Sequence, residues 1–214
     1  MNFKKLFILI LFVFLAYQNA NVKMVFVEDK SAPPYNLLET AVIRKANDFK
    51  RSYYQHQILN ECQFLHCDNF VNLNPDIFEL MINQCDKYDI PYSIFFSVVD
   101  RESGFRFIRN SEGSSAMGYM QMMPTTFRYC ASKIGLKGGH TPENNIKAGA
   151  YHLWDLHHDW SQKFSDDEEA WRWALAQYAT GLGGMQVEDS TGIHYEIPEA
   201  TLPGIERVMK NYSN

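Results

Sequence analysis

Apolar residues recur at helical spacing through the first third of the chain. Between residues 36 and 66 no glycine or proline interrupts them, and they stand mostly three or four positions apart: Leu37, Leu38, Ala41, Val42, Ala46, Tyr53, Tyr54, Ile58, Leu59 and Cys62. This spacing places apolar side chains on one face of an α-helix. The pattern therefore predicts one or two amphipathic helices, preceded by an extended linker at Ala32-Pro33-Pro34.

Helix start and stop signals divide the next part of the chain. Asn74 before Pro75 is a polar cap followed by proline in the first turn, which predicts a helix start, and Pro91 ends that region. The run from Tyr92 to Arg101 is apolar on nearly every side. We therefore expect it to form a helix in the core.

More helices are predicted after residue 123. One starts at Pro124 and ends before Gly135, another starts at Pro142, and another spans residues 166–181. Residues 183–203 carry apolar positions around a Ser-Thr-Gly turn, which fits either a short β-hairpin or a long loop. The predicted fold is mainly α, with a small hairpin as the β element that the pattern leaves open.

The first twenty residues have the composition of an export signal. Residues 1–5 contain two lysines, and residues 6–17 form an uncharged run rich in Leu, Ile and Phe. That run is shorter than the roughly 20 residues that span a bilayer as a helix. No clean Ala-x-Ala cleavage site follows it, so an uncleaved signal anchor stays open beside a cleaved signal peptide.

Size and charge limit the classes of function. A chain of 214 residues with 46% hydrophobic residues can bury the core of one domain and leave an extension. Its formal charge is −5, and removal of residues 1–20, with two lysines and no acidic residue, would make it −7. This balance disfavours nucleic acid and anionic membrane surfaces as partners.

The cysteines are Cys62, Cys67, Cys85 and Cys130. An exported chain can join them in up to two disulfides, and the sequence does not choose among the possible pairings. The competing zinc site lacks a second closely spaced cysteine pair. We therefore predict disulfides, and no metal or cofactor.

Glu102 stands at the end of the predicted core helix, just before Gly104. Apolar surroundings and the negative end of the helix dipole both favour a protonated carboxyl there. A general acid needs that state near neutral pH. The alternative is a helix-ending glutamate exposed to water.

Small residues follow at positions 114–118 and end in Gly118, where backbone can approach a ligand closely. Gln121 adds an amide able to bind sugar hydroxyls. For most of the methionines around it, core packing is the better interpretation. The cluster His152, His157 and His158 lacks the spacing of a helical metal pair, which favours a solvated helix face.

Four segments, in order, resemble the motifs of the soluble lytic transglycosylases of glycoside hydrolase family 23: Val99-Asp100-Arg101-Glu102-Ser103, Ala116-Met117-Gly118-Tyr119-Met120-Gln121-Met122-Met123-Pro124, Asn145-Ile146-Lys147-Ala148-Gly149-Ala150-Tyr151-His152-Leu153 and Ala174-Leu175-Ala176-Gln177-Tyr178-Ala179-Thr180-Gly181. The resemblance implies a lysozyme-like domain over residues 75–214, after the signal at 1–20 and a helical extension at 21–74. The extension is not covered by the resemblance.

The resemblance implies an activity on peptidoglycan. The reaction would cleave the β-1,4 bond between N-acetylmuramic acid and N-acetylglucosamine and leave 1,6-anhydro ends, with Glu102 as general acid and then base. By the same resemblance, Ser103 would position Glu102, and Gly118, Met120, Gln121 and Tyr178 would contact the saccharide. The alternative for Ser103 is a hydroxyl that caps the helix end. The expected setting is the bacterial periplasm or envelope, with inner-membrane anchoring if the signal stays attached, and we expect a monomer.

The last motif departs from the family pattern at Ala179. Family members usually have an asparagine there, so an amide that could bind substrate is lost. Two further hypotheses stay open: a hydrolytic lysozyme of the goose type, and a weakly active wall-binding or assembly protein whose N-terminal extension recruits partners in an envelope-spanning machine.

Overall fold

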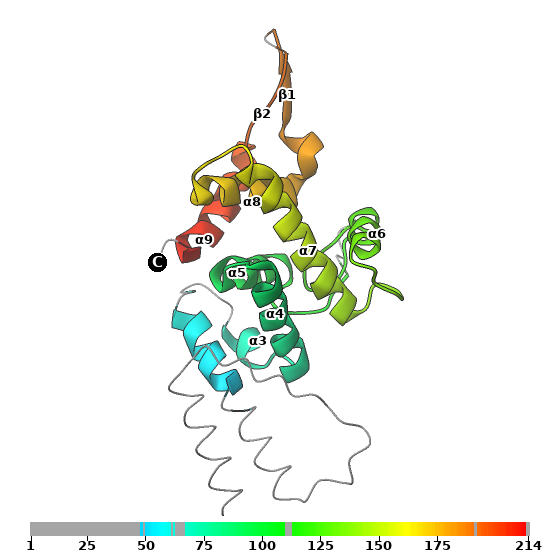
Figure 1. Cartoon of the computed structure of the whole chain (residues 1–214), viewed down its shortest axis with the longest axis vertical. Helices are drawn as coiled ribbons and strands as arrows, with labels where there is room; N and C mark the ends of the chain where they lie inside the picture. The colour runs from blue at the N-terminus through cyan, green and yellow to red at the C-terminus, as the bar shows by residue number, and fades with distance from the viewer. Residues whose placement is uncertain are drawn as a thin grey trace, which may run out of the picture. The chain divides into compact units, whose positions relative to one another are not determined.

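The computed structural model describes residues 48, 50–60, 62, 67–109, 113–190 and 192–212 (Figure 1). The chain divides into two compact units, Met1–Ser52 and Tyr53–Asn214, and all four motifs lie in the second. The predicted signal at residues 1–20 and the predicted linker lie outside the described residues. No helix in the described ranges combines the length and the apolar character that a membrane crossing requires.

Helices dominate the second unit. Residues 53–60 are helical. The elements after them are α3 (Cys67–Val71), α4 (Pro75–Tyr88), α5 (Tyr92–Ser103), α6 (Pro124–Lys133), α7 (Pro142–Ser161), α8 (Asp167–Met185), β1 (Gln186–Asp189), β2 (Gly192–Tyr195), the 3-10 helix η1 (Glu199–Thr201) and α9 (Leu202–Tyr212).

The helices begin where the cap residues predict. The Asn74 side chain accepts hydrogen bonds from the backbone N–H groups of Asp76 and Ile77, at 2.8 and 3.3 Å, ahead of Pro75 in the first turn of α4. Pro124 and Pro142 likewise stand in the first turns of α6 and α7. The side chains of Asn74 and Thr141 accept from N–H groups that α4 and α7 leave unsatisfied at their starts, whereas α6 begins without a side-chain cap. The predicted starts are confirmed.

The helix α8 runs past its predicted end at Gly181. At Gly181 the backbone leaves the helical region, with φ 71° and ψ 162°, and the helix resumes as far as Met185. The hairpin comes directly after it, with Gln186 paired to Tyr195 and Asp189 paired to Gly192 in antiparallel register. The hairpin interpretation of residues 183–203 is confirmed, and so is the mainly α fold; Figure 1 shows the two strands extending away from the helices.

The core lies between the long helices. Helix α7 packs against α4, α6 and α8, and α5 packs against α9. Ile58, Phe70 and Leu73 belong to the same buried cluster as α4 and α5. The compact unit therefore begins upstream of residue 75, where the sequence placed the start of the catalytic domain.

The cysteine prediction needs a correction. Cys85 and Cys130 are buried free thiols, and the buried thiol of Cys62 donates to the backbone oxygen of Ser93 at 3.9 Å. No disulfide joins these residues, and the side chain of Cys67 lies outside the described part. Each of the described thiols packs in the core as a small apolar group. Burial raises the pKa of the Cys130 thiol to about 12, which disfavours the reactive thiolate.

Candidate functional site

A left-handed turn ends α5 directly after Glu102 and Ser103. Gly104 has φ 56°, and its N–H donates to the Asp100 carbonyl at 2.8 Å. Phe105 also has a positive φ, 60°, which is rare for a bulky residue. Its ring is buried against Phe70, with centroids 5.3 Å apart, so the core holds this turn in place.

A cavity of about 240 Å³ opens at this end of α5. Its lining consists of residues 100–104 together with Asn69, Arg106 and Ile108. Glu102 and Ser103 are thus brought into one cavity. Gly118, Met120, Gln121 and Tyr178 do not belong to its lining.

Glu102 has the electrostatic setting that the sequence predicts for a general acid. Its side chain is 20% exposed, and burial raises its carboxyl pKa above the ordinary value. The guanidinium of Arg101 works in the opposite direction, with Nε 3.9 Å from Oε1 of Glu102. Burial is the larger of the two effects. The carboxyl therefore keeps its proton to a higher pH than a solvated glutamate does.

Ser103 is engaged by its own helix. Its buried hydroxyl donates to the Val99 carbonyl, four residues back, at 3.1 Å. This contact matches the helix-end interpretation of Ser103. Donation of the same proton to the Glu102 carboxylate would require the hydroxyl to turn away from Val99, whereas its oxygen can still accept a hydrogen bond.

The second motif forms a tight turn. The backbone N–H and carbonyl groups of Met117 and Met122 bond each other at 3.2 and 3.0 Å, and the Gly118 N–H donates to the Ile108 carbonyl at 2.8 Å. The amide nitrogen of Gln121 donates to the Ile108 and Gly118 carbonyls, at 3.1 and 2.8 Å. The amide predicted to bind sugar hydroxyls thus uses its N–H donors to hold the turn, which leaves its carbonyl oxygen for other partners.

Asn145 of α7 ties this turn to the core. Its side chain is fully buried; Oδ1 accepts from the Met120 N–H at 2.9 Å, and Nδ2 donates to the Met117 carbonyl at 3.0 Å. His140 Nε2 lies 2.7 Å from the same Nδ2. Asn145 opens the third motif, but the sequence assigned it no role. The signal that could have found it is a polar residue on the core-facing side of a helix.

The packing of Asn145 also explains Gly118. This glycine has φ 90°, and a Cβ there would lie 2.3 Å from the Asn145 Cγ. The position needs glycine because of an internal contact, whereas the sequence pattern suggested close approach of a ligand. The side chain of Met120 is fully buried, facing Gly149. It therefore packs in the core and does not line a groove, which corrects its predicted side-chain contact with saccharide.

Tyr178 connects α8 to both parts of the site. Its hydroxyl donates to the Met120 carbonyl at 2.7 Å. Burial, and next the negative charge of Glu102, raise the pKa of Tyr178 well above its usual range. The phenol therefore lies close enough to Glu102 to interact with its charge. The neighbouring Ala179, which replaces the family asparagine, is exposed.

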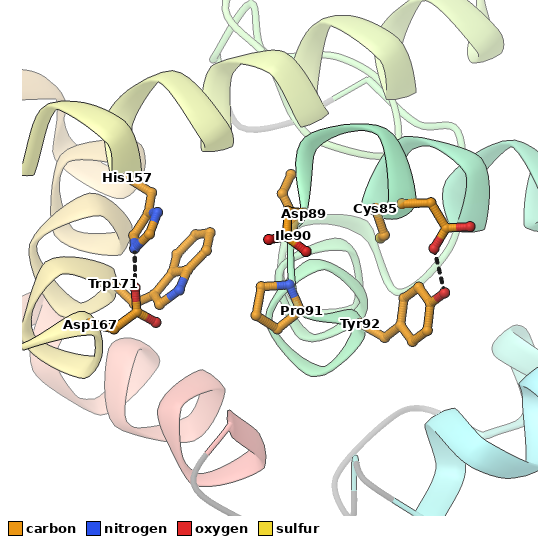
Figure 2. A pocket seen from close by; sticks show the side chains of 9 residues that line it. Cys85, Asp89, Ile90, Pro91, Tyr92, His157, Asp167 and Trp171 are labelled. Carbon is orange, nitrogen blue, oxygen red and sulfur yellow. Dashed lines mark hydrogen bonds and ion pairs between the residues drawn. The ribbon is translucent and has the colours of Figure 1, made fainter. Parts of the chain in front are cut away.

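A second cavity, of about 450 Å³, does not contain Glu102 (Figure 2). It includes His157, whose ring stacks on Trp171 at 3.9 Å and whose Nε2 lies 3.0 Å from Asp167. His157 thus makes packing and pairing contacts within the fold. The helix-face interpretation of the histidines holds for the exposed His158 but not for the inward-facing His152.

His152 packs beneath the site. Its ring centroid lies 5.4 Å from that of Tyr178, and its Nδ1 is buried without a hydrogen-bond partner. Burial lowers the pKa of His152 to about 4. The imidazole is therefore neutral at neutral pH, where protonation would put an uncompensated charge beside Tyr178.

We expect His152 to make the folded state sensitive to acid. Its pKa is about 4 when folded and about 6.5 when unfolded, so the unfolded chain binds the proton more readily between these values. The free energy of unfolding should therefore fall as pH drops from about 6.5 to 4. His152→Phe, which keeps a ring against Tyr178, should flatten this fall in urea titrations across that range. Replacement of the exposed His158 by Gln is the matched control, and an equal flattening by both variants would contradict the assignment.

Comparison with known proteins agrees with the four motifs. The family model of the transglycosylase SLT domain matches residues 79–195, more than half of the chain. Among solved structures, an inactive mutant of the lytic transglycosylase Slt from Pseudomonas aeruginosa aligns at a TM-score of 0.48 with 20% identity. That alignment covers 62% of this chain and 22% of the Slt chain, so this protein spans about a fifth of the length of that one. The resemblance found in the sequence is confirmed, and the chain belongs to the transglycosylase SLT domain family.

Proposed function

We propose that this protein cleaves the β-1,4 bond between N-acetylmuramic acid and N-acetylglucosamine in peptidoglycan, leaving a 1,6-anhydro end on the muramic acid. Membership of the SLT domain family supports the substrate class. The observation that carries the proposal is Glu102: a largely buried carboxyl, with a raised pKa, at the edge of a cavity.

One carboxyl is sufficient for this reaction. Protonated Glu102 gives its proton to the glycosidic oxygen as the bond to the anomeric carbon breaks. The 6-hydroxyl oxygen of the same muramic acid then bonds to the anomeric carbon, and its proton returns to Glu102. The enzyme is restored and no water is consumed, so a second acidic residue acting on water is not required.

The surroundings of Glu102 suit both steps. Burial favours the neutral acid needed for the first step. The Arg101 guanidinium, with Nε 3.9 Å from Oε1 of Glu102, favours the carboxylate that results. A group used in both directions works best when its pKa lies near the working pH.

Product analysis distinguishes this reaction from lysozyme-type hydrolysis. We expect digests of purified peptidoglycan in heavy-oxygen water to contain muramic ends that resist borohydride reduction, are lighter than reducing ends by one water, and carry no heavy oxygen. Mass spectrometry of the released muropeptides measures all of these. Reducible ends that carry the label would replace the proposal with a hydrolase on the same fold.

The exposed position of Ala179 favours a second candidate function. Without the family amide there, the site would bind wall glycan with little turnover. Retention of the protein on insoluble peptidoglycan with no released muropeptide would favour that function. In either case we propose that residues 1–20 export the chain to the envelope and that residues 21–74 contact other envelope proteins.

A further inference from the structure

The C-terminal helix α9 lies outside the residues that match the family, 79–195, yet it packs on the helix that carries Glu102 (Figure 1). Ile205, Val208 and Met209 of α9 are buried in the core, and two polar contacts tie the helix to α5. Asn211 Nδ2 donates to Ser97 Oγ at 2.8 Å in a buried position, and Arg207 reaches the buried Asp100 carboxylate at 3.4 Å. Both partners belong to α5, so α9 is held in one register against it.

That register brings Gly204 of α9 under the side chain of Arg101. A Cβ on Gly204 would lie 3.0 Å from Arg101 Cζ, 3.1 Å from Nε and 3.4 Å from a terminal nitrogen. Contacts at these distances are tighter than ordinary van der Waals packing. The guanidinium therefore rests on bare backbone, in a space that exists because residue 204 has no side chain.

In this position against Gly204, the Arg101 guanidinium lies beside Glu102. Arg101 Nε is 3.9 Å from Glu102 Oε1, and both side chains are partly exposed, at 27% and 20%. An ion pair of this length and exposure contributes little to stability. Its main effect is to favour the ionised form of the Glu102 carboxyl. Of the other charged groups around the cavity, Asp100 is engaged by Arg207, and Arg106 donates to the Ser103 carbonyl at 3.2 Å. The neutral phenol of Tyr178, on α8, lies outside the cavity lining.

We propose that Arg101 is a positioning residue for Glu102 and that α9, through Gly204, sets the place from which it acts. The inference rests on the proposed function of Glu102 and extends it. A helix outside the residues that match the family thereby influences the protonation of Glu102.

The sign of the effect is set by the charges. The Arg101 cation favours ionised Glu102, so its removal should let Glu102 keep its proton to higher pH. Activity that requires protonated Glu102 declines on the alkaline side as the proton is lost. In Arg101→Gln the alkaline limb of the kcat/KM profile should therefore move to higher pH by about half a unit. A close, buried ion pair would give a larger shift, but solvent screens the partly exposed pair of Arg101 and Glu102.

The test compares pH profiles of kcat/KM on soluble glycan strands for wild type, Arg101→Gln, Arg101→Lys and Gly204→Ala. Arg101→Lys keeps the positive charge and should keep the limb within a few tenths of a unit of wild type. Gly204→Ala should shift the limb in the same direction as Arg101→Gln, because the new methyl group displaces the guanidinium.

The double variant separates positioning from a general effect on the fold. If α9 acts through Arg101, Gly204→Ala should add no further shift in the Arg101→Gln background, because the guanidinium that the new methyl group displaces is absent there. Equal and additive shifts in the two backgrounds would overturn the role of α9. An unchanged profile in Arg101→Gln would overturn the whole inference. Activity that is absent in wild type, or that survives Glu102→Gln, would instead contradict the proposed function.

Discussion

Glu102→Gln should abolish release of anhydro-muropeptides while the protein stays folded. Glutamine has nearly the same shape but can neither donate the acid proton nor accept it back. A general acid or base is worth about a hundredfold to ten-thousandfold in rate. Since Glu102 would act in both steps, we expect a loss toward the upper end of that range. Muropeptide release from purified peptidoglycan, followed by chromatography and mass spectrometry, measures it.

Stability should change little, because the ion pair of the Glu102 carboxyl with Arg101 is long, at 3.9 Å, and burial already favours the neutral form. Urea unfolding of the variant checks this. Glu199→Gln, at an exposed position of η1, is the matched control and should keep wild-type turnover. More than about a tenth of the wild-type rate in folded Glu102→Gln would show that another group supplies the proton.

Gly118→Ala should be the most destabilising small substitution near the site. The added Cβ would lie 2.3 Å from Asn145 Cγ and 2.5 Å from both terminal atoms of that side chain. The Asn145 amide would have to move, which breaks its buried hydrogen bonds to Met120 and Met117. The clash, the broken hydrogen bonds and the strain of an alanine at positive φ act together. We expect them to lower the unfolding free energy by about 3–5 kcal/mol, measured by urea titration.

Gly138→Ala separates backbone strain from the contact with Asn145. Gly138 has φ 91°, nearly the same as the 90° of Gly118, but a Cβ there meets nothing closer than 3.8 Å. We expect it to lose only the contribution of strain, about 1–2 kcal/mol. In the Asn145→Ala background the additional effect of Gly118→Ala should fall to a similar size, because the obstructing side chain is gone. Equal losses for Gly118→Ala and Gly138→Ala in the wild-type background would contradict the packing argument.

Local signals predicted the helices well because their physical causes are local. Asn74 and Pro75 start α4 through a cap and a preset φ, and Gly104 ends α5 in the left-handed region, which places Glu102 in the last turn. The order of the four motifs identified the family before any geometry was known.

The features that the sequence did not predict depend on contacts between distant segments. Asn145 and Gly118 are far apart in the chain, so the spacing of apolar residues could not predict that their side chain and backbone pack together. Met120 looked like a groove residue, but its side chain fills space against Gly149 on α7. The cysteines suggested disulfides from compartment and number alone, whereas the pairing of sulfur atoms depends on where the helices place them.

The turn held by Asn145 has a consequence for how glycan would bind. Asn145, Gln121 and Tyr178 all bond to backbone groups of this turn, so its shape is fixed by folding before any sugar arrives. A ligand that contacts a fixed turn does not lose binding free energy to the ordering of a loop. We therefore expect this segment to lose its conformational entropy on folding, so that binding of glycan would not carry the cost of ordering it.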